Sequence, residues 1–291
     1  MRGILPYMVC GAIVTVVGGA FAKSGSHVVT AQMRANALAN VDRYEWAADQ
    51  QQAAIRAAQP YVEMSDEALW RMVPSQWVPR NCGIHNGTGV GCPNCGKEIL
   101  NVREPQMYMR YAYDRAEHPW KLKCKNCGTL FPSNDYGAFH RSGLDDRGEF
   151  DPERADKGLL HNPEHPDPND PDHMLWVDDG YGLAYSGETL TIIAHYTYSL
   201  WRECINATRA LAHAWTVTGD PIYAHKAGVL LSRFADIYPN IDYQGFVAAN
   251  GWGISDGGSK KGHDPRSDLG DADGIEALVG LRRGLRADAR G

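Results

Sequence analysis

The sequence lacks any excess or clustering of basic residues. Its 29 Lys and Arg are outnumbered by 35 Asp and Glu, which gives a formal net charge of -6. Nucleic-acid binding depends on basic side chains gathered on one surface. The composition therefore excludes nucleic acid as an expected partner, whereas 43% hydrophobic residues suffice for a globular core.

Long apolar runs are also scarce, and the one present lies at the N-terminus. It extends over residues 4–17, between Arg2 and the triplet Ala20-Phe21-Ala22. This order predicts a secretory signal peptide over residues 1–22, cleaved after Ala22. A membrane anchor is the alternative, but the run is shorter than the roughly 20 residues that span a bilayer. The mature protein is expected to be exported, to the periplasm or the medium, with no membrane contact after the signal is removed.

Seven cysteines are present, at positions 10, 82, 92, 95, 124, 127 and 204. In an exported protein, the six beyond the signal peptide could form three disulfides. The spacing favours a metal site instead, because residues 92–96 (CPNCG) and 124–128 (CKNCG) repeat one pattern. Two intervening residues let both thiolates of a pair face one cation, and the glycine lets amide N–H groups point at them. A zinc-ribbon-like site is therefore predicted, with ligands Cys92, Cys95, Cys124 and Cys127.

Four thiolates would fill the coordination sphere of zinc, so the predicted ion is structural rather than catalytic. A redox role is the main alternative for a Cys-x-x-Cys pair. It is disfavoured because two matched pairs occur and no βαβ pattern surrounds either. Cys82 and His85 precede the first pair and could replace a ligand. Cys204, on an apolar helix face, is predicted to be a buried core thiol.

The mature chain is predicted to be mainly α-helical with an inserted β subdomain. Residues 23–78 are expected to form a helix from about Ala31 to Val62 and a short helix capped by Ser65. Residues 79–132 are expected to form the zinc-ribbon-like insert, with strands at 107–113 and 119–123. Residues 133–186, rich in Asp, Pro, Gly and His, are expected to form a long irregular loop.

Residues 187–250 have the clearest helical pattern. Apolar residues recur at three- and four-residue steps from Leu190 to Trp215, which predicts a long amphipathic helix. Gly219, Asp220 and Pro221 suit the end of that helix and the start of a second one, which is expected to end near Ile237. Antiparallel helices joined by a tight turn are the repeating unit both of stacked helical arrays and of α/α toroids. The segment is therefore predicted to be an α/α hairpin of one of these two folds.

One polar stripe follows the other face of the long helix. By helical spacing it contains Thr191, His195, Tyr198, Arg202, Asn206, Arg209 and His213. A solvated outer face is one interpretation of the stripe. A cleft-facing stripe is the other, because these side chains form more directed hydrogen bonds than the usual Lys and Glu.

Residues 176–185 combine aromatic rings, carboxylates and glycines. Trp176, Asp179, Tyr181 and Tyr185 lie in this segment, just before the long helix. Aromatic rings beside acids are common in sugar-binding sites, and an aromatic-rich packing loop is an equally good interpretation. These four residues, with Asn206, are the candidate substrate-binding residues.

Several of these segments together resemble one family. The chain resembles the N-terminal region of bacterial heparinase II/III-like proteins in four features: the two CxxCG knuckles, residues 131–135 (FPSND), residues 177–182 (VDDGYG) and residues 212–220 (AHAWTVTGD). The resemblance extends from about Tyr44 to Asp242. It implies an exported polysaccharide lyase, in which an α/α toroid precedes a β-sandwich, acting on glycans that contain uronic acid. On this resemblance the fold is predicted to be an incomplete α/α toroid with the inserted zinc-ribbon-like β subdomain.

The chemistry of such a lyase can be compared with the residues present. β-Elimination removes the C5 proton of a uronate, which becomes acidic once the neighbouring carboxylate is neutralised. Arg, Asn or His can neutralise it, while Tyr or His serves as base and Tyr as acid. His195, Tyr198 and Arg202 supply these types within two helical turns and are the candidate catalytic residues.

The sequence departs from the family beyond residue 250. Residues 251–291 shift to Gly, Asp, Ser, Lys and Arg, which suggests a truncated or frameshifted product that lacks activity by itself. Two hypotheses stand. The chain is the N-terminal part of a lyase that cleaves acidic polysaccharide, or it is a non-catalytic exported helical module with structural zinc that binds glycan or protein.

Overall fold

The fold is known from a computed structural model, which describes residues 28–75, 77–81, 83–84 and 91–238. The predicted signal peptide, Cys82, His85 and the tail at 251–291 lie outside the described residues. About half of the structure is helical, with small antiparallel sheets, so the prediction of a mainly α fold with a β insert is confirmed at this level. No helix in the described ranges is both long and apolar enough to cross a membrane.

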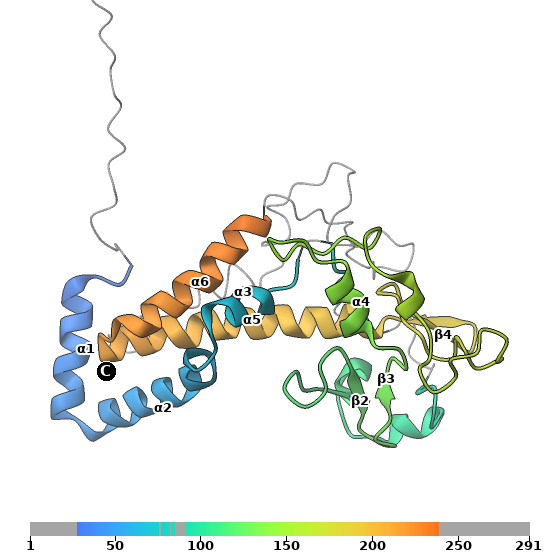
Figure 1. The fold of residues 1–291 in the computed structure, drawn as a ribbon. Coiled ribbons are helices and arrows are strands. Elements are labelled where there is room, and N and C mark those ends of the chain that lie inside the picture. The colour runs from blue at the N-terminus through green and yellow to red at the C-terminus, as the bar shows by residue number, and fades with distance from the viewer. Residues whose placement is uncertain (1–27, 76, 82, 85–90, 239–291) are drawn as a thin grey trace, which may run out of the picture.

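The largest layer is made of α2 (Glu45–Val62), α5 (Ile192–Thr218) and α6 (Pro221–Ile237), with α1 (Ala31–Arg43) across one end (Figure 1). The α5–α6 hairpin is confirmed. Gly219 has φ 74° after α5, and the Asp220 carboxylate accepts a hydrogen bond from Ile222 N at 3.0 Å. These helices bury Ala58, Leu211 and Leu230 completely. Together they are one hairpin with an added helix, and a toroid is not shown.

The expected helix from Ala31 to Val62 is interrupted at Tyr44. That residue has extended backbone angles and separates α1 from α2. The last turn of α1 contains Asn40, Val41 and Asp42, all weak helix formers, which lowers the cost of a break there. The short helix α3 (Asp66–Met72) is confirmed, and the Ser65 hydroxyl accepts from Ala68 N at 3.1 Å.

The β insert packs beneath the first half of α5 (Figure 1). Its sheet has the order β1 (Tyr111–Tyr113), β2 (Leu122–Cys124), β3 (Leu130–Phe131), all antiparallel. The strand expected over 107–113 is shorter, because Met107–Arg110 forms a 3-10 turn, η2, beside η1 (Lys97–Asn101). Leu122 and Phe131, paired across the sheet, are fully buried and join the insert to the helical core.

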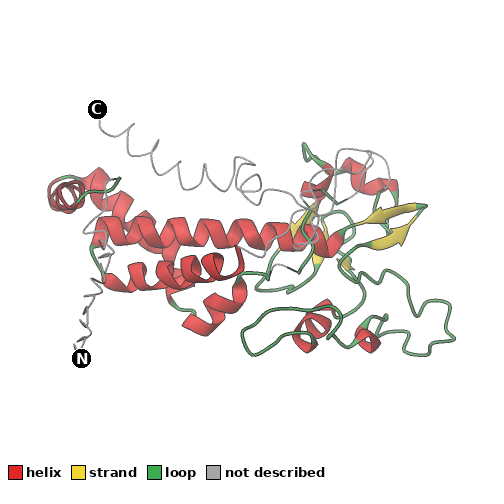
Figure 2. Ribbon diagram, turned by 90° about the horizontal axis from the view of Figure 1, so that it is seen from above, coloured by secondary structure: helices red, strands yellow, loops and turns green. Residues whose placement is uncertain are grey.

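The segment expected to be irregular over 133–186 contains three regular elements. They are α4 (Tyr136–Ser142), the turn η3 (Lys157–Leu159) and strand β4 (Leu183–Tyr185), which pairs with β5 (Glu188–Leu190). The Asp135 carboxylate caps α4 by accepting from Ala138 N at 2.9 Å. The remaining loops gather around the starting end of α5, away from the helical layer (Figure 2).

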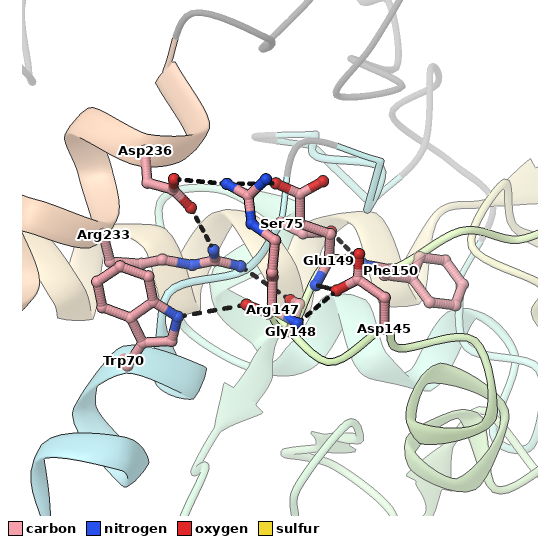
Figure 3. Close-up of polar contacts among 9 residues, drawn as sticks. All are labelled: Trp70, Ser75, Asp145, Arg147, Gly148, Glu149, Phe150, Arg233 and Asp236. Atoms are coloured by element: carbon pink, nitrogen blue, oxygen red, sulfur yellow. Dashed lines mark hydrogen bonds and ion pairs between the residues drawn. The ribbon is translucent and has the colours of Figure 1, made fainter.

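A network of polar contacts ties the loop after α4 to α3 and α6 (Figure 3). Arg233 on α6 is 1% exposed, and its guanidinium donates to Asp236 and to Gly148 O, both at 2.8 Å. Arg147 reaches the same Asp236 carboxylate at 3.0 Å, and Arg233 lies 5.1 Å from the ring of Trp70. Because Arg147 of the loop and Arg233 of α6 share the Asp236 carboxylate, these contacts fix the position of the loop along α6.

A second, smaller core forms around α4. It contains the buried residues Val78, Tyr136, Phe139, Phe150, Ala155 and Ile193. His140 lies against it, with ring centroids 4.6 Å from Trp120 and 4.9 Å from Phe150. Its Nε2 atom is buried and has no hydrogen-bond partner among the residues that the structure describes. Burial lowers the pKa of His140 to about 4, with a smaller effect from Arg141.

This buried imidazole predicts acid sensitivity. Between pH 6.5 and about 4 an unfolded histidine binds a proton that the folded one does not, so stability is lost as the pH falls through this window. The loss from His140 is at most about 3 kcal/mol. Replacing His140 with phenylalanine keeps the aromatic contacts and removes the titrating group. The unfolding free energy, measured in urea, should therefore fall less between pH 7 and pH 4 in the variant than in the wild type.

The matched control is His140→Gln, which also cannot titrate but buries an amide. It should show the same reduced pH dependence at lower stability throughout. Equal acid sensitivity of His140→Phe and wild type would contradict the assignment.

Candidate functional site

The four cysteines of the two knuckles come together at one end of the β insert. All four sulfur atoms lie within 4.8 Å of one another. Cys92 Sγ is 3.9 Å from Cys127 Sγ, and Cys95 Sγ is 3.8 Å from Cys124 Sγ. A tetrahedron with metal–sulfur bonds of about 2.3 Å has edges of about 3.8 Å. The cluster could hold a metal ion, and its spacing is that of a tetrahedral thiolate site.

The backbone of each knuckle is closed by the glycine that follows its second cysteine. Gly96 N donates to Cys92 O at 2.8 Å, and Gly128 N donates to Cys124 O at 2.9 Å. Both glycines have positive φ, 56° and 78°, a conformation that L side chains rarely adopt. The expected role of these glycines in the turn is therefore confirmed.

Local environment sets the ionisation of the thiols. Burial raises the pKa of Cys92, although the backbone N–H groups of Cys95 and Asn94 oppose it. Burial raises the pKa of Cys124 as well, against the N–H groups of Cys127 and Asn126. Because thiols must lose their protons to bind a cation, metal binding at this cluster would release protons.

A polar network fixes the insert to α5. Tyr113 Oη donates to Glu203 at 2.6 Å, and Arg115 pairs with the same carboxylate at 2.9 Å. Burial raises the pKa of Tyr113, as does its contact with Glu203, so the phenol keeps its proton. The ring of Tyr196 lies 5.1 Å from that of Tyr113 and 5.2 Å from that of Trp120. The cysteine cluster thus belongs to a subdomain that is rigidly attached to the long helix.

The polar stripe of α5 is neither wholly solvated nor wholly enclosed. His195 is 5% exposed and its Nδ1 donates to Asn81 O at 3.2 Å, whereas Tyr198 is half-buried. Arg202 is exposed, with its guanidinium 5.7 Å from the ring centroid of Tyr198. Asn206 is exposed one turn further along. The stripe changes from buried to exposed along the helix, because the β insert covers only its first turns.

The structure adds one side chain that the sequence analysis missed. The ring of Tyr108, from η2 of the insert, lies 5.2 Å from the ring of His195, and the ring of Tyr198 lies 6.0 Å from it. The structure therefore brings the three predicted catalytic residues together with a second tyrosine. No sequence pattern indicated Tyr108, because the contact joins residues 87 positions apart.

The other candidate residues lie before α5, near its starting end. Trp176 is half-buried, with its ring 5.3 Å from Phe131, so it contributes to packing. Asp179 is exposed and accepts from Tyr181 N at 2.9 Å, and Tyr181 is 49% exposed. Tyr185 on β4 is half-buried. Asp179 and Tyr181 are accessible to a ligand, whereas Trp176 has a structural role.

Asp178, which the sequence analysis passed over, has the most constrained carboxylate near α5. It is fully buried and accepts from Gly180 N at 2.7 Å, Gly182 N at 2.9 Å and Ile193 N at 3.0 Å. Asn134 holds its backbone through bonds of 2.9 Å and 3.0 Å. Burial raises the pKa of Asp178 to about 6, against these donors. An Asp two residues before a Gly, ahead of a helix, is the signal that could have indicated this turn.

A groove of about 500 Å³ lies between α3 and α6, apart from the stripe. It is lined by Asp66, Glu67, Trp70, His225, Gly228, Val229 and Ser232. The Asp66 carboxylate is paired with Lys226 at 2.9 Å and with His225 at 2.7 Å, so its negative charge is already balanced by protein side chains. None of the predicted site residues lines this groove.

The chain was compared with protein-family models, curated proteins and solved structures. No protein-family model, no curated protein and no solved structure matches it.

Proposed function

We propose that the four-cysteine cluster binds one structural zinc ion. The support is the donor set of four thiols with sulfur separations of 3.8 Å and 3.9 Å in two matched knuckles. Four protein ligands leave no open position, so the ion would stabilise the insert and would not act in catalysis. The insert in turn places Tyr108 against His195.

We further propose that the chain carries the N-terminal region of an exported lyase that cleaves uronic-acid-containing polysaccharide by β-elimination. The observation that carries this proposal is the juxtaposition of Tyr108, His195 and Tyr198, with Arg202 beside Tyr198. Arg202 would neutralise the uronate carboxylate, and a tyrosine or His195 would remove the C5 proton. A tyrosine would then protonate the leaving oxygen.

A non-catalytic glycan-binding module is the second candidate. The burial of His195 favours it, because an imidazole that is 5% exposed is poorly placed to reach a substrate. In that case the exposed Asp179, Tyr181 and Arg202 would contact an acidic glycan without cleaving it.

The two candidates differ in one measurable product. Alginate, heparan, chondroitin and hyaluronan are each incubated with the chain, and the ultraviolet absorbance of unsaturated uronate is followed. Product from any of them would show that this region is a lyase by itself, contrary to the inactivity expected from residues 251–291. In that case Tyr198→Phe, which removes one hydroxyl, should lower turnover about 100-fold or more.

The matched control is His213→Ala, at an exposed position of the same stripe. It should leave turnover unchanged. Saturable binding without product would reject the lyase for this chain and support the module.

A further inference from the structure

A second group of metal-donor side chains lies in the loop between η3 and β4. Nδ1 of His165 and one carboxylate oxygen each of Asp170 and Asp172 all lie within 4.8 Å of one another. His165 Nδ1 is 3.0 Å from Asp170 Oδ2. This group belongs to a different part of the chain from the cysteine cluster, and it offers nitrogen and oxygen donors rather than sulfur.

The carboxylates of this loop outnumber its cationic partners. The sequence contains no Lys or Arg from residue 158 to residue 201, whereas Glu164, Asp167, Asp170 and Asp172 place four carboxylates within nine residues. In the described part of the chain, no lysine or arginine forms an ion pair with any of the four, and Asp170 pairs only with His165. Carboxylates gathered without cationic partners repel one another, and a bound divalent cation would remove that repulsion.

The loop is already folded around the group. His173 Nδ1 donates to His165 O at 2.8 Å, and Asn162 N donates to His173 O at 2.7 Å. The ring of His161 stacks on that of His173, with centroids 5.2 Å apart. These contacts hold the loop without a cation. His165 Nδ1 and Asp170 Oδ2 already contact each other, and Asp170 Oδ1 accepts from Asp172 N at 2.8 Å, so a cation would replace the His165–Asp170 contact and would not have to order the loop.

We propose that His165, Asp170 and Asp172 bind a divalent first-row transition-metal ion such as Mn²⁺ or Zn²⁺. One imidazole nitrogen with two carboxylates suits these ions, whereas Ca²⁺ takes six to eight oxygen ligands. Two donors at right angles, each about 2.1 Å from an ion, are about 3.0 Å apart. Nδ1 and Oδ2 are already this far apart in the hydrogen bond that they form with each other, so a cation would take the place of its proton without moving either atom far. Three protein ligands leave positions on the ion for water or for an acidic group of a ligand.

The experiment uses Mn²⁺ as the probe, because carboxylates bind it well and thiolates bind it poorly. The full chain is first loaded with one equivalent of zinc at the cysteine cluster. Mn²⁺ is then titrated in, and the free ion is followed by its paramagnetic resonance signal. One Mn²⁺ per chain is expected. His165→Ala and Asp170→Asn should each weaken binding by about tenfold or more.

Asp167→Asn is the matched control. It removes the same charge from the same loop, but the Asp167 carboxylate is bonded to Asn169 and lies outside the group. Unchanged affinity in Asp167→Asn with loss in Asp170→Asn supports the site. Equal loss in both variants would overturn it, because diffuse attraction by the acidic loop would then explain binding.

Two further readouts complete the test. The zinc content of the cysteine cluster and the melting temperature of each variant show whether the chain remains folded. If Mn²⁺ does not bind to the wild type, calorimetry with Zn²⁺ beyond the first equivalent is decisive. Absence of binding by both ions would overturn the proposal.

Discussion

Replacing Cys124 with serine is expected to unfold the β insert and abolish zinc binding. The substitution removes one of four thiolates, and structural zinc supplies folding free energy on the order of 10 kcal/mol. The insert packs against the helical core through Leu122 and Phe131, so its unfolding would also expose the face of α5 that it covers. Zinc content per chain and the unfolding free energy in urea measure the effect.

Cys204→Ala is the matched control for this prediction. Cys204 is a fully buried thiol on α5, as the sequence predicted, and it lies outside the cluster. Its replacement should leave one zinc per chain and lower stability only by the small cavity that it creates. A Cys124→Ser protein with normal zinc content and an unchanged urea transition would show that the metal assignment is wrong.

Replacing Asp178 with alanine is expected to have the next largest effect, a loss on the order of 5 kcal/mol. The substitution leaves the N–H groups of Gly180, Gly182 and Ile193 without their acceptor. Each unpaired buried donor costs about 1–3 kcal/mol. Because Ile193 is in the first turn of α5, hydrogen exchange of the amides there should become faster. Urea unfolding at pH 7 measures the total loss.

Two variants separate the parts of this effect. Asp178→Asn keeps an oxygen for Gly180 and Gly182 but turns an amide donor toward Ile193, so it should lose about a third to a half of the stability lost by alanine. Asp179→Ala removes an exposed carboxylate that, within the described part of the chain, accepts a hydrogen bond only from Tyr181 N, and it should cost less than about 1 kcal/mol. Equal losses at positions 178 and 179 would contradict the assigned role.

Local patterns predicted the parts of the fold that local interactions form. Ser65, Gly219, Asp220 and Pro221 marked helix ends correctly, because a cap forms with residues two to four positions away. The two knuckles were predicted together because each is a five-residue turn whose thiols carry the same chemistry. The short helix α4 has the same length as α3 and was missed because its cap, Asp135, lies at the start of a segment rich in Asp, Pro, Gly and His, which was interpreted as a loop.

The sequence by itself therefore determined the capped ends of α3, α5 and α6 and the four cysteines as one cluster. The tertiary structure alone decided that His195 is buried while Arg202 is exposed, that Tyr108 lies beside His195, and that Asp178 rather than Asp179 holds the start of α5. The physical reason is that capping and knuckle turns join neighbours in the chain. Burial and ring contacts instead depend on which distant segment covers a given face, and no residue pattern within α5 encodes where the β insert ends on it.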